Sequence, residues 1–75
     1  MEHPLSSRFG DLIRRLRLEA ALSQEDLAAA AGLHSTYVSR LERGLRVPSL
    51  LVVEQLASAL SKSLSELMLE LEKSG

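Results

Sequence analysis

The chain has 75 residues, of which 45% are hydrophobic, and its formal net charge is −1. This length suits one domain near the lower size limit for an unstapled core, and the absence of cysteine excludes disulfides and thiolate metal sites. A net charge near zero argues against a binder that relies on a large basic excess. All seven arginines lie before Val47 and both lysines after it, so a few well-placed phosphate contacts remain possible.

A tail is predicted over residues 1–5, and the first helix follows it. Ser6 or Ser7 is expected to cap this helix, which runs to about Ala20. Its apolar residues recur at the spacing i, i+3, i+4 and i+7, which places them on one stripe facing a core. These residues are Phe9, Leu12, Ile13 and Leu16.

The segment 23–43 has the pattern of two short helices joined by a tight turn. Ser23 is a natural N-cap, and Asp26 stands three residues later, at the spacing of a capping box. Gly32 supplies the positive φ that ends the first of these helices, Gln24 to Ala31. The second covers about Ser35 to Arg43. Two helices this short around a glycine turn are typical of a DNA-binding helix-turn-helix.

Two further helices are predicted after the interruption at Pro48. Ser49 caps the first of them, which covers about residues 50–60, and Ser63 or Ser65 begins the second, which ends at about residue 73. No stretch alternates apolar and polar residues in the manner of a strand. The sequence therefore predicts an all-α, compact five-helix fold, with residues 6–75 forming one domain.

The outward face of the second short helix carries the candidate DNA-reading residues. If Val38 and Leu41 face the core, four polar side chains near the start of this helix face outward. Arg40 is the strongest candidate, because a guanidinium can bond to guanine O6 and N7 together. An ordinary solvated face is the alternative. The four residues are Ser35, Thr36, Ser39 and Arg40.

Other polar residues around the two short helices are candidates for DNA phosphate contacts. Gln24 stands in the first turn of its helix, where free backbone N–H groups and the helix dipole favour an anion. Such contacts set register without reading sequence, and simple solubility is the alternative for the arginines. The remaining candidates are His34, Tyr37, Arg43 and Arg46.

Arg17 and Glu42 are a candidate ion pair. Glu42 stands at the end of a helix, where the dipole disfavours a carboxylate, and an arginine partner would relieve that. Arg17 lies near the end of the first helix. Two separate exposed charges are the alternative.

Catalysis finds no support in the residue pattern. There is no glycine-rich phosphate loop, no nucleophile elbow and no histidine cluster with metal-binding spacing, and a chain this small has little room for a pocket. No enzyme activity, metal or cofactor is predicted. No apolar run reaches the length of a signal peptide or membrane span, so a cytoplasmic location and no membrane contact are expected.

Several stretches together closely resemble the Cro/CI-type (XRE) helix-turn-helix regulators of bacteria and phages. They are SQEDLAAAAGL, YVSRLERG and PS followed by LASAL, and the match covers roughly residues 8–68. The resemblance implies a lambda-repressor-like domain that binds operator DNA, usually as a two-fold dimer on a palindrome. It matches Gln24 with a phosphate-binding glutamine and Arg17 and Glu42 with a structural ion pair. It matches base-reading positions with Ser35, Thr36, Ser39 and Arg40.

The small size of the chain most resembles the restriction–modification controller proteins, although phage-like repressors and antitoxins share the domain. Two residues depart from the family pattern, since Ala21 and Ser61 stand where glycine often follows a helix. The serine at position 35 has a short side chain, so base specificity is expected to rest on Arg40 or on DNA shape.

A homodimer is predicted from surplus apolar residues. Leu51, Val52 and Leu69 lie off the best apolar stripes of their helices, which marks an interface, with the helix over 63–73 contributing to it. A monomer with a few exposed leucines is the alternative. The predicted function is operator binding by a dimeric transcriptional regulator, with palindromic double-stranded DNA as the partner and RNA polymerase as a further candidate. An antitoxin-like or protein-interaction module without specific DNA binding is the competing function.

Overall fold

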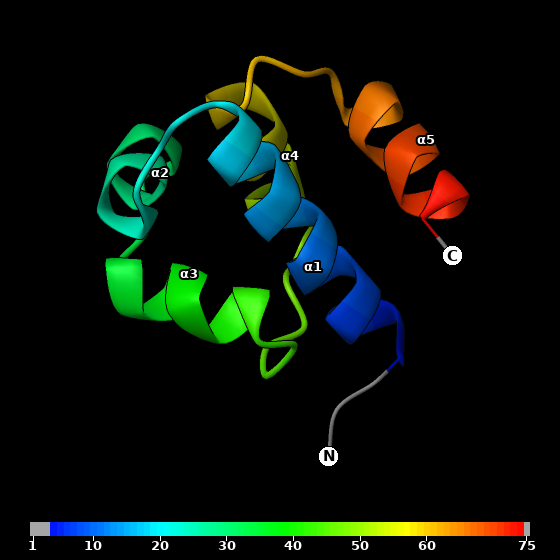
Figure 1. Ribbon diagram of the computed structural model, residues 1–75, viewed down its shortest axis with the longest axis horizontal. Helices are drawn as coiled ribbons and strands as arrows, with labels where there is room; N and C mark the ends of the chain where they lie inside the picture. Colours follow the sequence, from blue (N-terminus) through cyan, green and yellow to red (C-terminus); the bar gives the residue numbers. More distant parts are fainter. Residues whose placement is uncertain (1–3, 75) are drawn as a thin grey trace.

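The computed structural model describes residues 4–74, which form five helices with short connections. The helices are α1 (Pro4–Glu19), α2 (Gln24–Ala31), α3 (Ser35–Glu42), α4 (Leu50–Ala59) and α5 (Leu64–Lys73). The predicted all-α, five-helix fold is confirmed. Helix α1 runs through the middle of the bundle, with α2 and α3 on one side and α5 on the other (Figure 1). Within the described residues, no helix is both long and apolar enough to cross a membrane.

The core is built from the apolar stripes that the sequence predicted. Every helix contributes to one cluster, and the four stripe residues of α1 are all buried. Helices α2 and α3 contribute their predicted inward residues, and Tyr37 packs partly against the cluster. The buried apolar residues of α2 to α5 are Leu27, Ala28, Ala31, Val38, Leu41, Val53, Leu56, Ala57, Leu67 and Leu71.

The predicted start of the first helix is wrong. Helix α1 begins at Pro4, so Pro4 and Leu5 belong to the helix rather than to a tail, and residues 1–3 lie outside the described residues. Proline is favoured in the first turn because its φ is already helical and its missing N–H needs no partner there. Ser6 is buried within the helix and is not its cap.

Four helices end in the same way, with one residue in the left-handed conformation. The N–H of the following residue then donates to a carbonyl five positions back, as in a Schellman motif. These bonds join Leu22 to Arg17, Leu33 to Ala28, Leu45 to Arg40 and Lys62 to Ala57, at 2.8 to 3.0 Å. The left-handed residues are Ala21, Gly32, Gly44 and Ser61, with φ between 59° and 77°. Both turns that lack the family's glycine are therefore formed by the ordinary geometry.

Ala21→Gly and Ser61→Gly are each expected to raise the free energy of unfolding by about 0.5–1 kcal/mol. A side chain in the left-handed region costs about 1–2 kcal/mol, and the greater freedom of glycine in the unfolded chain offsets only part of this gain. Urea denaturation measures the change. Ala30→Gly, at an exposed position in the last turn of α2 with ordinary helical φ, is the control and should lower stability. Lower stability in both turn variants would show that the side chains of Ala21 and Ser61 cause no backbone strain in the left-handed conformation.

Gly10 lets α1 and α3 approach closely. A Cβ at this position would strike the carbonyl oxygen of Leu41 and lie 2.8 Å from that of Glu42, so it would collide with the backbone at the end of α3. The role of Gly10 was not predictable from the sequence, because nothing in a helical pattern shows which neighbouring helix will cross a given glycine. The close approach fixes the position of α3 on the bundle.

Gly10→Ala is therefore expected to lower the free energy of unfolding by about 1–3 kcal/mol, the usual effect of overpacking. Helix propensity alone predicts the opposite, a gain of about 1 kcal/mol. Thermal and urea denaturation decide the sign. Arg14→Ala, at an exposed position of the same helix, serves as the control and should stay within about 0.5 kcal/mol of the parent.

Candidate nucleic-acid interface

Helices α2 and α3 form a rigid frame that presents one face of α3. The predicted capping box is present, since the Ser23 hydroxyl accepts from the N–H of Asp26 at 2.9 Å and the Asp26 carboxylate accepts from the N–H of Ser23 at 3.2 Å. Gly32 then turns the chain, with φ of 72°. Val38 and Leu41 are fully buried, which fixes the rotation of α3 about its axis.

The four predicted base-reading residues lie on the remaining faces of α3. Thr36 and Arg40 are exposed, whereas Ser35 and Ser39 are half-buried. In a helix-turn-helix, side chains from the N-terminal part of the second helix reach base edges in the major groove. On this helix, the Arg40 guanidinium and the Thr36 hydroxyl are thus the predicted base-reading groups that are fully exposed.

The other predicted contact residues surround this face. His34 is the N-cap residue of α3, and its exposed side chain makes no capping hydrogen bond. Arg43 donates from Nε to the Ser39 carbonyl at a long 3.4 Å. The Arg46 guanidinium lies over the Tyr37 ring, 5.3 Å from its centroid. Arg46 therefore belongs to the surroundings of α3 although it follows the helix in the chain.

Positive charge remains uncompensated on and after α3. Within residues 4–74, Arg40, Arg43 and Arg46 form no ion pair, whereas Arg15 and Arg17 both contact carboxylates. Three exposed guanidinium groups are thus available to an anion at this end of the molecule. The overall charge of −1 does not reveal this local positive charge, because much of the acidic charge lies elsewhere, on α1, α4 and α5.

The predicted pairing of Arg17 with Glu42 is present as a buried two-point contact. Arg17 Nε donates to Glu42 Oε2 at 2.7 Å and Nη2 donates to Oε1 at 3.1 Å, and both residues are less than 10% exposed. Arg17 Nη1 also donates to the Leu22 carbonyl at 2.8 Å. The hydrogen bond with Glu42 raises the pKa of Arg17 above its ordinary value, so the guanidinium stays charged.

Gln24 extends this pair to a third helix, which the sequence did not predict. Its Nε2 donates to Glu42 Oε1 at 3.1 Å. The Glu42 carboxylate on α3 thus holds both Arg17 on α1 and Gln24 on α2, and the three helices meet at one group. An amide nitrogen carries two hydrogens, so this bond leaves one of them for an anion. The half-buried Gln24 remains near the position that the phosphate prediction requires.

The predicted interface residues differ in exposure. Leu51 and Leu69 are 63% and 51% exposed, but Val52 is half-buried and packs partly against its own core. Leu51 lies on α4 and Leu69 on α5, two helices that pack against each other. Other apolar side chains in the same part of the chain, which were not predicted as interface residues, are also exposed. They are Leu45, Val47 and Leu50.

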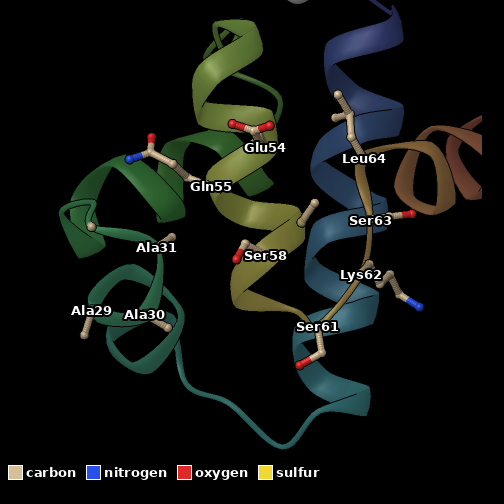
Figure 2. A pocket seen from close by; sticks show the side chains of 12 residues that line it. Ala29, Ala30, Ala31, Glu54, Gln55, Ser58, Ser61, Lys62, Ser63 and Leu64 are labelled. Carbon is tan, nitrogen blue, oxygen red and sulfur yellow. The ribbon is translucent and has the colours of Figure 1, made fainter.

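A prominent hollow lies away from α3. It is an open concavity between the C-terminal ends of α2 and α4 and the turn that leads into α5 (Figure 2). Small side chains dominate its lining, and the charged groups there are Glu54 and Lys62. Lys62 is itself paired with Glu70 at 3.3 Å. The hollow and the exposed face of α3 are therefore separate features.

Comparison with known proteins agrees with the helix-turn-helix arrangement of α2 and α3. A family model described as helix-turn-helix matches residues 13–67, which include all of α2, α3 and α4. The chain belongs to this helix-turn-helix family, of the XRE type. The matched span also includes Arg17 and Glu42, which form the buried ion pair.

Relatives within the family include restriction–modification controller proteins. The control protein C.MunI of a Mycoplasma species is 43% identical over 67 residues, which cover 88% of this chain and 90% of that protein. The controller C.AhdI from Aeromonas hydrophila is 44% identical with a TM-score of 0.79, over 83% of this chain and 94% of that one. The controller C.Esp1396I was solved as a tetramer with its natural 35 base-pair operator. It has a TM-score of 0.91 at 33% identity, and the match covers 97% of this chain and 96% of that one. These relatives are regulators.

Proposed function

We propose that this protein is a transcriptional regulator that binds operator DNA as a homodimer and controls a restriction–modification operon. The observation that carries the proposal is the exposed Arg40 on α3, a helix held by a buried ion pair, together with two further unpaired arginines, Arg43 and Arg46, that follow the helix. The controller relatives support the finer assignment. Such a protein acts on chromosomal or plasmid DNA in the cytoplasm and carries no catalytic role.

Base reading falls to the exposed side of α3. Arg40 donates in a two-point contact to guanine, and Thr36 offers a hydroxyl and a methyl to an adjacent base. Ser35 and Ser39 are half-buried and short, so they contribute where the groove approaches closely. The main sequence preference is therefore expected to be a guanine opposite Arg40.

Phosphate binding falls to the residues on either side of α3. Gln24 offers its second amide hydrogen at the start of α2, beside the free N–H groups of the first turn. His34, Arg43 and Arg46 place donors around α3, and Tyr37 contributes through its ring or hydroxyl. These contacts fix the register of the protein on the duplex without reading bases.

A protein-interaction or antitoxin-like module is the second candidate, and the net charge of −1 favours it. A module of this kind keeps the fold but makes no base-specific contact. The two candidates differ in what Arg40 does, because the interaction module leaves it as a solvated surface residue. RNA polymerase is a candidate partner of the regulator only.

Arg40→Ala is expected to weaken binding to the selected operator by about 1–3 kcal/mol, roughly five- to 150-fold, and to leave random DNA almost unaffected. The loss is specific because the guanidinium contact exists only with the correct base. Fluorescence anisotropy on both duplexes measures it. Lys73→Ala removes one charge from α5 and is the control, which should bind both duplexes as the parent does. Equal losses on both duplexes would contradict base reading by Arg40.

A further inference from the structure

The stacked pair formed by Tyr37 and Arg46 connects α3 to the segment that follows it. Tyr37 is half-buried on α3, and its ring packs partly against the core, so its position is fixed by the fold. Arg46 is exposed in the connection between α3 and α4, and its guanidinium carbon lies 5.3 Å from the ring centroid. This is within the distance of about 6 Å at which a cation is attracted to an aromatic face.

Few other contacts hold Arg46 in place. The last backbone bond from α3 to this segment is that of Leu45 N–H with the Arg40 carbonyl, at 3.0 Å. Within residues 4–74, the backbone N–H groups of Arg46 and Val47 donate to no backbone carbonyl, and Pro48 has no N–H to donate. The Arg46 side chain also has no carboxylate partner in this range. The Tyr37 ring is therefore the contact that positions the Arg46 guanidinium.

A stacked guanidinium keeps its binding capacity. The ring covers one face of the planar group, whereas the five N–H donors point outward in that plane. These donors match the oxygens of a phosphate, and two parallel bonds to one phosphate are a common arrangement. An arginine ordered in this way loses less conformational freedom on binding than one that is free in solution.

We propose that Tyr37 is a positioning residue, whose aromatic face holds Arg46 ready to bind a DNA phosphate beside the recognition helix. The inference rests on the proposed operator binding. It assigns the role of Tyr37 to the ring rather than to the hydroxyl. Tyr37 and Arg46 then make one phosphate contact together, through the Arg46 guanidinium, instead of one contact each. It also makes the connection between α3 and α4 part of the DNA-binding surface.

The free protein provides the first test. Tyr37 is the only tyrosine, there is no tryptophan, and the single phenylalanine, Phe9, is buried in the core. The part of the ring-current displacement of the Arg46 side-chain protons in NMR spectra that is lost when the Tyr37 ring is removed therefore reports on the stack. We expect upfield shifts that persist in Tyr37→Phe and disappear in Tyr37→Leu. Shifts equal to those of the unstacked Arg14 would overturn the proposal without reference to DNA.

Binding to the selected operator provides the second test. Arg46→Ala is expected to weaken binding about three- to tenfold and to reduce the salt dependence by about one phosphate contact. Tyr37→Phe should bind like the parent, and Tyr37→Leu should lose about as much as Arg46→Ala. Combining Tyr37→Leu with Arg46→Ala should add little, because both remove the same contact. Arg46→Ala alters only an exposed side chain, so it keeps the test valid if Tyr37→Leu folds poorly.

The outcomes separate this inference from the proposed function. If Tyr37→Phe loses as much as Tyr37→Leu, the hydroxyl makes the contact and the proposal is overturned. If Arg40→Ala abolishes specific binding but Arg46→Ala and Tyr37→Leu change nothing, the operator assignment stands and the positioning role is wrong. If the parent protein selects no DNA sequence at all, both fail.

Discussion

Arg17→Met is expected to lower the free energy of unfolding by about 3–5 kcal/mol, enough to unfold a large fraction of a domain this small. Methionine fills much of the volume of the arginine stem but offers no donor to the Glu42 carboxylate, which is only 6% exposed. The substitution therefore leaves a buried charge without its two-point partner. Urea denaturation followed by circular dichroism measures the loss.

Two controls distinguish this effect from a simple loss of charge. Arg15→Met removes exposed ion pairs with Glu19 and Glu70 and should change stability by no more than about 1 kcal/mol. Combining Arg17→Met with Glu42→Leu removes the stranded carboxylate and should recover much of the stability. A small effect of Arg17→Met alone would show that Glu42 finds another partner or reaches water.

Leu69→Glu is expected to convert the proposed dimer into a monomer and to weaken binding to a palindromic operator by about 10²- to 10⁴-fold. The side chain is 51% exposed on α5, so the substitution places a charge in the proposed interface without disturbing the core of the subunit. A dimer holds two recognition helices about 34 Å apart, one DNA turn, and the second half-site then binds intramolecularly. Sedimentation velocity and operator titration measure the two effects on one sample.

The control for this experiment is another exposed leucine. Leu18 is 53% exposed but lies on α1, and Leu18→Glu should leave both the sedimentation and the operator affinity unchanged. Leu51→Glu on α4 should act in the same direction as Leu69→Glu. If the variants at Leu51 and Leu69 remain dimers of unchanged affinity, this surface is not the interface.

The helices and their buried faces were predictable from the sequence because the apolar residues recur at the helical spacing. Phe9 and Ile13 of α1 and Leu67 and Leu71 of α5 are buried as that spacing requires. The Ser23 cap was equally predictable, since a capping box depends on residues three positions apart. Local rules are enough wherever the deciding contact lies within one turn of the chain.

Features that depend on the meeting of distant segments were not predictable from these rules. The need for glycine at position 10 arises from the backbone of α3, and the bond of Gln24 with Glu42 joins two helices. The pairing of Arg17 with Glu42 was predicted only as one of two alternatives until family resemblance favoured it. Apolar side chains such as Leu50, which is 72% exposed, were missed because exposure depends on packing between helices.

The left-handed turns show a different limit. A glycine pattern identified the ends of α2 and α3, but Ala21 and Ser61 adopt the same conformation with a side chain present. Each of these two turns is closed by the same kind of backbone bond as its glycine counterparts. The ends of α1 and α4 were therefore predicted near their observed positions, but the left-handed conformation of Ala21 and Ser61 was not predicted.

Selection of binding sites from a random duplex library, with the parent protein and Arg40→Ala in parallel, tests the central claim most directly. The account predicts that the parent enriches a palindrome with half-sites about ten base pairs apart, centre to centre, and that Arg40→Ala loses the enrichment. Salt titration of the winning site then shows specific binding well above that to random DNA. No enriched sequence, with only weak and salt-sensitive binding, would contradict operator recognition and leave the helix-turn-helix as a scaffold for protein partners.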